Sequence, residues 1–504
     1  MDKTAFKTHN ALIRFINNDS NFRFAFIGAF FFASLCLIRD WFYIAAGIMM
    51  IWGAYLTGYK YIFKGYILRV RNRKLLYIFL GLSLFTALLH LSNNLVINLY
   101  MLVYMTECFV LFYGLHAGRS RNKAQHEMQK MLDFLNTSTF IVMIAGLVLL
   151  IIFPSGFVIN GDSFAIHENR FVGILFNANV TAFYSLMGII YCNLLWVIKK
   201  SVDKLTVKIR IWYIVCMVIH ILSLFLTDSN DSILMLIVYG CFIAFYVLFR
   251  GYKPTILNFI FRIIALALSC ALIAAVILGA RILVQEGVSA LFKMFESPAK
   301  VTEIHSPSGN VVVKPNPQKV PTTFEHQNTN LDSGRFVIWK QSIGLFGKFP
   351  LFGIGKANIV DYGKKYLGGL KYEDFHNGLI TIIISCGMTG FFVFMVLAVT
   401  IAKTMLKAIF RYRKENRRDG RVLMYITAFC AGYCIYSMFE VALLADLSYR
   451  VLIFWMLIGY AMSYTNSYEN HAVRAHDNIS DRTRSIYRIA CYKAMQKQLP
   501  HSQK

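Results

Sequence analysis

The sequence has few charged residues for its length. Only 15% of its 504 residues are charged, whereas 57% are hydrophobic and 15% are aromatic. A soluble domain could not bury that much apolar surface. Repeated apolar runs of about 20 residues are long enough to cross a bilayer core of roughly 30 Å. The composition therefore excludes a soluble protein and predicts an all-α, polytopic membrane protein.

Acidic residues are half as frequent as basic ones, 26 against 52, which gives a net charge of +26. The basic residues gather in alternate short loops, as orientation signals do. Such loops also suit anionic lipid headgroups. We therefore expect membrane lipid, and no nucleic acid, among the partners, with both termini in the cytoplasm.

Several chemical signatures are missing. No Asp-x-Asp pair occurs in the chain, which disfavours glycosyltransferases that hold a nucleotide sugar through a divalent metal. Nine of the ten cysteines lie inside apolar runs, where thiols behave as small hydrophobes, so we expect no disulfide framework. No internal repeat of the transporter type is visible. We predict neither a metal nor a cofactor.

The apolar runs predict about twelve transmembrane helices. The first begins near Phe22 and has no cleavage site after it, so we expect it to be retained. The predicted spans lie near residues 22–38, 41–58, 75–91, 95–114, 133–153, 178–198, 210–227, 232–249, 256–284, 389–409, 421–440 and 446–465.

One connection is much longer than the others. Residues 1–285 hold spans one to nine, 286–388 form a large extracytoplasmic loop, 389–465 hold spans ten to twelve, and 466–504 form a basic cytoplasmic tail. Six of the nine prolines fall in the loop. Within it we predict an irregular stretch at 298–331, an amphipathic helix at 334–347 and an apolar helix at 377–386 that ends at a turn around Gly387.

Ionisable side chains are almost missing from the middle of the spans. Arg262 and Arg281 lie toward opposite ends of their run and can snorkel. Ion-coupled transporters usually need buried acids, so the pattern argues against a transporter. The short outer loops contain only two arginines, Arg39 and Arg170.

Three outer segments carry candidate chemistry. Arg170 precedes Asn177 and Asn179 in the loop between spans five and six, and its donor fork suits phosphate. The alternative is an interfacial arginine that pairs with Glu168 or with lipid headgroups.

Arg335 is the second candidate. Asp332 or Ser333 can cap the helix that follows, which places Arg335 in its first turn, beside Gly334. A cation there opposes the helix dipole and needs a compensating anion, which a diphosphate could supply. The alternative is a solvated arginine paired with Asp332.

His376 is the third candidate, with Asp374 and Asn377 on either side of it. It lies where the outer loop re-enters the membrane, and Asp374 is expected to cap the following helix. A neutral imidazole there could take a hydroxyl proton near pH 7. The alternative is a histidine that only anchors the chain at the interface. Together, two arginines and one histidine suit a lipid-diphosphate leaving group and a hydroxyl nucleophile.

These motifs resemble the O-antigen ligase and Wzy-type polysaccharide polymerase superfamily. The matching elements are, in chain order, Arg170-Phe171-Val172-Gly173, Asn177-Ala178-Asn179, Ser333-Gly334-Arg335 with Trp339, Pro350-Leu351-Phe352-Gly353-Ile354-Gly355, His376-Asn377 and Gly387. The resemblance covers residues from about 165 to 410. One element departs from it: Thr227-Asp228-Ser229-Asn230 stands where the family often has Thr-x-Ser-Arg, so a third cation is missing or another residue supplies it.

The resemblance implies metal-independent glycosyl transfer at the outer face of the bacterial cytoplasmic membrane. The donor would be a glycan on undecaprenyl diphosphate, held by Arg170 and Arg335, with His376 as the base on an acceptor hydroxyl and inversion at the sugar. Asn177, Asn179, Ser333, Gly334, Asp374 and Asn377 would support these residues. The acceptor is another lipid-linked repeat unit in a polymerase, or a lipid-A core sugar in a ligase.

The missing arginine at position 230, and an outer loop without a clear acceptor-binding domain, favour a polymerase. Other polysaccharide-assembly membrane proteins are possible partners. A lipid-linked oligosaccharide transporter and an inactive scaffold are the contrasting alternatives. A scaffold predicts that Arg335 and His376 tolerate substitution.

Overall fold

The structure is a computed structural model of the whole chain. It describes residues 12–118, 120–159, 161–201, 204–250, 255–295, 314–315, 335–370, 374–411, 417–444 and 446–465. The predicted supporting residues Ser333 and Gly334 lie outside the described residues. So do the predicted cytoplasmic tail at 466–504 and almost all of the stretch at 298–331.

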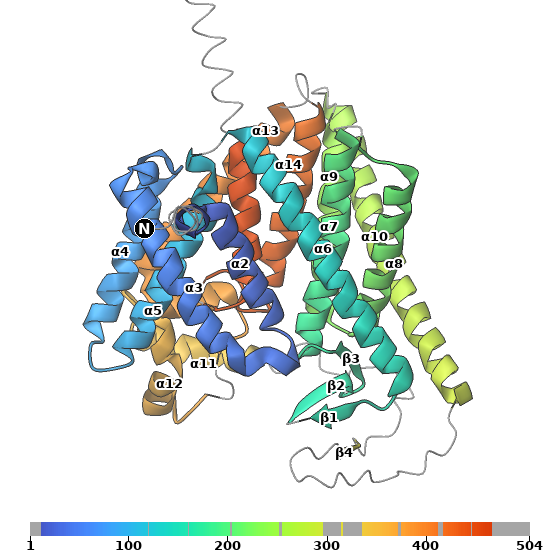
Figure 1. Cartoon of the computed structure of the whole chain (residues 1–504), viewed down its shortest axis with the longest axis horizontal. Helices are drawn as coiled ribbons and strands as arrows, with labels where there is room; N and C mark the ends of the chain where they lie inside the picture. The colour runs from blue at the N-terminus through green and yellow to red at the C-terminus, as the bar shows by residue number, and fades with distance from the viewer. Residues whose placement is uncertain are drawn as a thin grey trace, which may run out of the picture.

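The apolar runs form helices that stand side by side in one bundle (Figure 1). Each predicted span coincides with a helical segment: α2 (Asp19–Phe32), α3 (Phe42–Leu56), α4 (Arg73–Leu89), α5 (Leu95–Glu107), α6 (Arg121–Ile152), α7 (Ala178–Ser201), α8 (Val207–Leu226), α9 (Asn230–Phe249), α10 (Ile256–Phe295), α13 (Gly378–Arg411), α14 (Arg417–Tyr436) and residues 449–465.

Seven helices in the described ranges are long and apolar enough to cross a membrane. The prediction of a helical, multi-pass membrane protein is therefore confirmed in outline. The count of twelve spans and the large outer loop stay predictions.

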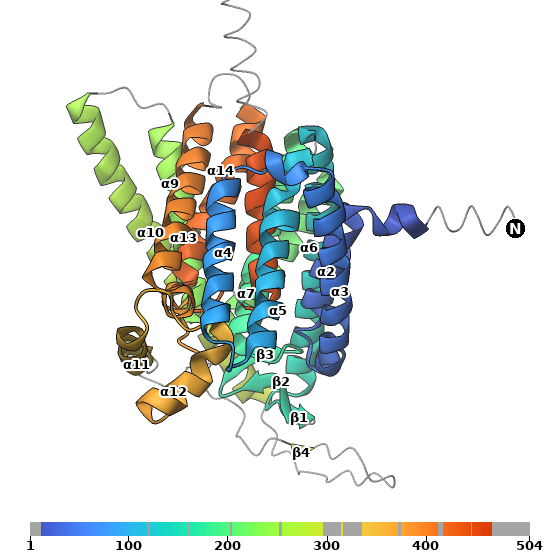
Figure 2. The same ribbon diagram turned by 90° about the vertical axis from the view of Figure 1, so that its left-hand side faces the viewer.

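Two helices form the middle of the bundle, and a third lies at its edge. In helix 449–465 every residue except Arg450 is buried, and α7 is the most buried of the seven long apolar helices. By contrast, the most apolar stretch of α10 has no buried residue, and α10 leans away from the bundle in Figure 2. The helix that carries Arg450 is therefore a fixed central element.

A small sheet covers one end of the bundle, which the sequence analysis did not predict. Its strands are β1 (Phe157–Ile159), β2 (Asp162–His167), β3 (Arg170–Gly173) and β4 (Lys314–Pro315), in the antiparallel order β3-β2-β1-β4. Glu168 and Asn169 both have positive φ between β2 and β3, as a two-residue type I′ hairpin turn requires. The turn places Arg170 at the start of β3.

Two short helices lie at the same end of the bundle as the sheet in both views (Figures 1 and 2). They are α11 (Arg335–Lys348) and α12 (Ile359–Leu367), and α11 confirms the amphipathic helix predicted at 334–347. Its buried side chains Ile338, Ser342 and Leu345 recur at helical spacing.

The first turns of α13 form the apolar helix predicted at 377–386, which is named the re-entrant helix here for its predicted course. Gly387 interrupts α13 with a φ of 65° and a ψ of −174°, so the chain is helical before and after it. The segment that follows α11 pairs with this break: Met388 N donates to Pro350 O at 2.8 Å, and Ile354 N donates to Ile384 O at 3.0 Å. A Cβ at Gly387 would collide with the backbone of Leu351. The Pro350–Gly355 motif and Gly387 therefore form one joint that fixes the re-entrant helix.

One buried acid corrects the expectation that the predicted spans lack them, and a second is buried just before the predicted span 133–153. Glu107, inside the predicted span 95–114, is 1% exposed, and both its carboxylate oxygens lack a hydrogen-bond partner among the described residues. Glu127 of α6 is buried too, and it binds Arg23 of α2 at 2.7 Å and Tyr460 Oη at 3.0 Å. The argument against a transporter that rested on missing acids is therefore wrong.

The Arg23–Glu127 pair yields a stability prediction. Arg23→Ala leaves a buried carboxylate without its counter-ion, which typically costs about 3–5 kcal/mol. We expect a clear drop in the thermal unfolding temperature of the detergent-solubilised protein. Arg14→Ala, at an exposed residue, is the matched control. An Arg23→Met/Glu127→Leu variant should recover most of the loss, and unchanged unfolding of Arg23→Ala would contradict the assignment.

Candidate active site

The hairpin of β2 and β3 places Arg170 against two helix ends. Its Nε donates to Thr227 O at 2.8 Å, and its Nη2 donates to Asn179 Oδ1 at 2.6 Å. Burial lowers the pKa of the Arg170 guanidinium, while the nearby carboxylates Asp228 and Asp231 oppose that shift. Arg170 is therefore held by groups of the protein itself, and Glu168, the partner considered in the sequence analysis, is a third nearby carboxylate that opposes the lowering of its pKa.

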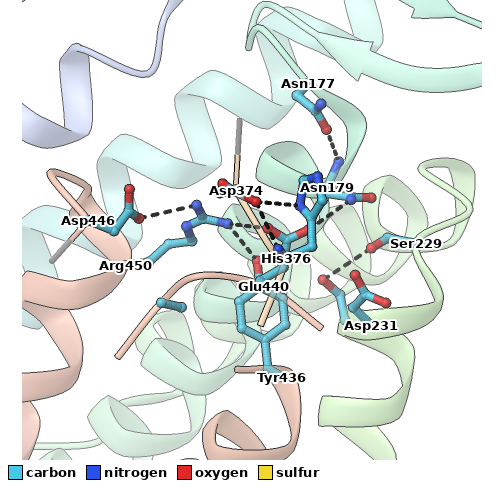
Figure 3. A network of polar contacts seen from close by, with 12 residues as sticks. Asn177, Asn179, Ser229, Asp231, Asp374, His376, Tyr436, Glu440, Asp446 and Arg450 are labelled. Carbon is cyan, nitrogen blue, oxygen red and sulfur yellow. Dashed lines mark hydrogen bonds and ion pairs between the residues drawn. The ribbon is translucent and has the colours of Figure 1, made fainter. Parts of the chain in front are cut away.

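The two predicted asparagines at the start of α7 differ in role. Asn177 Oδ1 accepts a hydrogen bond from Asn179 N at 2.7 Å, which stabilises the first turn of α7. The Asn179 side chain instead bridges two charged groups, since its Oδ1 accepts from Arg170 and its Nδ2 donates to Glu440 Oε1 at 3.1 Å. Asn179 thus joins the Arg170 hairpin to Glu440, in the turn before helix 449–465. Figure 3 shows Asn179 beside Glu440.

A second, half-buried arginine lies on the other side of Glu440. Arg450 Nη1 donates to Glu440 Oε2 at 3.1 Å and to Tyr436 Oη at 3.2 Å, and its Nη2 donates to Asp446 Oδ2 at 3.3 Å (Figure 3). The sequence analysis missed this cluster, because Arg450 falls near the start of the predicted span 446–465. The sequence did carry one signal. Glu440, Asp446 and Arg450 lie within eleven positions where two otherwise apolar runs meet.

Arg335 obtains a compensating anion from the first turn of α9, a source that the sequence analysis did not consider. Its Nη1 and Nη2 donate to the two carboxylate oxygens of Asp231 at 3.0 and 2.7 Å, and its guanidinium lies 5.4 Å from the ring centre of Phe439. Asp332, the alternative partner, lies outside the described residues. The parallel pair holds the guanidinium in one plane, with the first turn of α11 beside it.

The structure supplies a cation at the position where Asn230 departs from the family pattern. Arg281, from the C-terminal half of α10, donates through Nη1 to Asn230 Oδ1 at 2.9 Å and forms an ion pair with Asp228. Gln285, one turn further along α10, also donates to Asp228 Oδ1 at 3.1 Å. The sequence analysis left two alternatives for position 230: a third cation is missing, or another residue supplies it. The position of Arg281 fits the second alternative.

His376 lies in a strained turn directly before the re-entrant helix. Its φ is 44°, its backbone N donates to Asp374 Oδ1 at 2.8 Å, and its Nδ1 is 3.5 Å from the same oxygen. The side chain is 37% exposed, so a substrate could reach the ring. The expectation that Asp374 caps the helix is wrong: Asn377 Oδ1 accepts the hydrogen bond from Ile380 N at 2.9 Å.

Two hydrogen bonds fix the His376 turn against the turn that carries Glu440. Asn377 Nδ2 donates to Met438 O at 2.8 Å, and Gly378 N donates to Ser437 O at 2.7 Å. His376 is thereby brought to the network of Asn179, Glu440 and Arg450, as Figure 3 shows. The structure thus gathers the predicted residues Arg170, Asn177, Asn179, Arg335, Asp374, His376 and Asn377 at one end of the bundle.

The site combines paired charges with one reachable titratable ring. Its members are Arg170, Arg281, Arg335 and Arg450, the carboxylates Asp228, Asp231, Asp374, Glu440 and Asp446, and His376. Half-buried arginines fixed by carboxylates keep further N–H donors in set directions, which suits an anionic oxygen group. Within the described ranges, no three His, Cys, Asp or Glu side chains come together to hold a metal ion.

Comparison with known proteins adds one finding. Residues 215–395 match a family model described as O-antigen ligase. The match contains Asn230, Arg281, Arg335, His376 and Gly387, whereas Arg170 and Arg450 lie beyond its ends. No curated protein matches the chain. The matched region, which is less than half of the chain, supports the resemblance to the superfamily of O-antigen ligases and Wzy-type polymerases.

Proposed function

We propose that the protein is a glycosyltransferase that polymerises undecaprenyl-diphosphate-linked repeat units at the outer face of the cytoplasmic membrane. The observation that carries this proposal is the placement of His376 beside a set of oriented arginines at one end of an apolar bundle. Such an end is where a lipid-linked substrate would present its head group. The proposed localisation and the cytoplasmic termini rest on the alternation of basic loops.

In the proposed reaction, an acceptor hydroxyl attacks the first sugar carbon of the donor. A new carbon–oxygen bond forms on one face while the bond to the diphosphate oxygen breaks on the other, which inverts the carbon. The diphosphate leaves with the bonding electrons, and His376 takes the hydroxyl proton. Arg170 and Arg335 bind the diphosphate and stabilise its developing charge, which fixed donors do at no cost of reorganisation.

A ligase is the second candidate, and two observations favour it. The matched family model is described as O-antigen ligase. Moreover, Arg281 supplies a cation at Asn230, so the departure at that position no longer separates this chain from the ligase-like pattern. The polymerase proposal therefore rests on the size of the elements that surround the site. In the described residues these are the small sheet and the two short helices α11 and α12, which form no clear acceptor-binding domain.

Deletion of the gene in its host, followed by electrophoresis of the surface glycans, tests the proposal. Loss of long chains, with one repeat unit still on its acceptor, would support a polymerase. Full-length polymer that accumulates on its carrier lipid, with the final acceptor bare, would instead indicate a ligase. Unchanged glycans would contradict both and favour a transporter or a scaffold.

Arg335→Lys provides a residue-level prediction. Lysine can form one ion pair with Asp231, but it cannot offer two parallel N–H bonds or the planar fork that matches phosphate oxygens. We expect transfer to fall by at least about tenfold, measured as polymer per amount of inserted protein. Lys340→Arg, on the exposed side of α11, is the control. Normal polymer from Arg335→Lys at normal expression would remove Arg335 from the proposed site.

A further inference from the structure

A polar pocket of about 610 Å³ lies at the end of the bundle opposite the candidate active site. The start of α2, the segments that follow α3 and the first turns of α6 line it. Figure 1 shows α6 running from that end to the small sheet, and its 32 residues extend over about 48 Å. The pocket is therefore separate from the site that contains Arg170 and His376.

Basic side chains converge on the pocket from three parts of the chain. Lys123 and Lys130 lie about two turns apart in α6, so they share one face of that helix. Lys60 comes from the segment after α3, and Arg14 comes from a short helix at residues 12–16. These segments are far apart in the chain, so the fold itself assembles the basic cluster.

The two carboxylates that line the pocket already have counter-ions. Asp19 forms an ion pair with Lys60, and Glu127 forms one with Arg23 beneath the pocket. These acids therefore do not neutralise the other basic side chains of the lining.

Three cations of the lining are left over. Within the part of the chain that the structure describes, Arg14, Lys123 and Lys130 form no ion pair with a carboxylate. The N-terminus of α2 opens into the same pocket, since Asn18 and Ser20 line it, and the helix dipole adds positive potential there. The pocket is thus complementary to an anion with several acceptor oxygens, such as phosphate.

Aromatic contacts indicate that the pocket lies at the level of the lipid head groups. Trp52 Nε1 donates to Ile16 O at 2.8 Å, and Phe15 stacks on the Trp52 ring with centres 5.8 Å apart. Tryptophan is enriched at membrane–water interfaces. These contacts hold the short helix that carries Arg14, which projects sideways from the bundle in Figure 2 and exposes Leu12 and Phe15. An apolar surface on a helix in that direction suits the membrane interface.

We propose that this pocket binds a phosphate group, supplied by the head group of an anionic membrane lipid. The pocket lies at the end of the bundle that is predicted to face the cytoplasm, where basic pockets between membrane helices suit such head groups. Free phosphate offers the same oxygens. However, the exposed side chains of Ile62 and Phe63, which follow Lys60 closely, add apolar contacts that only a lipid with its acyl chains could use.

Removal of two lysines of α6 tests this proposal. Lys123→Gln/Lys130→Gln deletes two positive charges at exposed positions and keeps good helix formers. Lys403→Gln/Lys407→Gln is the matched control, because both lysines are exposed near the end of α13 and do not line the pocket.

The assay uses the purified full-length proteins in an uncharged detergent. Each protein would receive phosphatidylglycerol, phosphatidylcholine or inorganic phosphate. The measured quantity is the apparent Kd of each probe, obtained from the rise in the thermal unfolding temperature. Because the assay needs no glycan transfer, its result is independent of the proposed function.

We expect phosphatidylglycerol to bind the wild-type protein and the control at least about tenfold more tightly than phosphatidylcholine does. Lys123→Gln/Lys130→Gln should lose that preference, whereas the charge-retaining variant Lys123→Arg/Lys130→Arg should keep it. A preference that survives in the glutamine variant, or that the arginine variant loses, would overturn the proposal. So would binding of inorganic phosphate without any preference between the two lipids, because it would indicate a site for free phosphate.

Discussion

Removal of the His376 imidazole is expected to abolish glycan transfer while the protein still inserts in the membrane. A positioned general base typically contributes a factor of about 10²–10⁴ to the rate. His376 is the one site residue whose ring combines partial exposure with a carboxylate, Asp374, 3.5 Å from Nδ1. That carboxylate can orient the ring and stabilise the charged form after it has taken a proton.

The backbone of His376 decides which substitution is informative. Its φ of 44° lies in the left-handed region, where asparagine and histidine are tolerated better than alanine. His376→Ala therefore combines the loss of the base with local strain, whereas His376→Asn keeps the turn and removes the base alone. Both variants should lose long-chain glycan on a gel.

A comparison with Asp374→Asn separates the base from its support. Asp374 Oδ1 accepts the His376 backbone N–H at 2.8 Å, and an asparagine oxygen could still accept it. We expect Asp374→Asn to lower the rate less than His376→Asn does. Normal polymer from His376→Asn at normal expression would exclude His376 as the base and would leave the Glu440 and Asp231 carboxylates as the next candidates.

The helices of the bundle and the interruption of α13 at Gly387 were predictable from sequence, because they depend on local patterns. Apolar runs indicated each helix of the bundle, and the glycine at 387 indicated the end of the re-entrant helix. The hairpin of β1 and β2 carried a local signal too: Asn160-Gly161 between short apolar strands is typical of a two-residue turn. That signal was overlooked because the segment lay between two strong apolar runs.

The pairing of charges was not predictable, since it joins residues far apart in the chain. Arg335 and its partner Asp231 are 104 positions apart, and Asn179 and Glu440 are 261 positions apart. A sequence shows that a cation in the first turn of a helix needs an anion, but not which helix provides it. For the same reason the acids at 107 and 127 were missed, as their burial depends on the packing of several helices.

Arg281 carries the second large effect that we expect. Arg281→Ala removes a cation from the site, and loss of one fixed charge-stabilising donor typically lowers a rate by about 10²–10³. Arg262→Ala is the matched control, because Arg262 lies nearer the other end of α10 and bonds to Asn258 instead of the site. The comparison uses the transfer rate per amount of folded, inserted protein.

The contact between Arg281 and Asn230 permits a rescue. Arg281 Nη1 is 2.9 Å from Asn230 Oδ1, so an arginine at position 230 would extend into the space that Arg281→Ala vacates. The double variant Arg281→Ala/Asn230→Arg should therefore recover most of the activity lost in Arg281→Ala. It would also restore the Thr-x-Ser-Arg pattern of the family at residues 227–230. Failure of the double variant, with normal folding, would mean that the cation must come from α10.

A purely structural role for Arg281 makes a different prediction. Arg281 forms an ion pair with Asp228, so it could serve only to neutralise that carboxylate. In that case Arg281→Ala/Asp228→Asn, which removes both charges, should restore activity. If the cation itself stabilises the leaving diphosphate, this neutral pair stays inactive while Arg281→Ala/Asn230→Arg is active. An arginine at position 230 should restore activity under either role, because it would also neutralise Asp228, so the transfer activity of the neutral pair Arg281→Ala/Asp228→Asn decides between them.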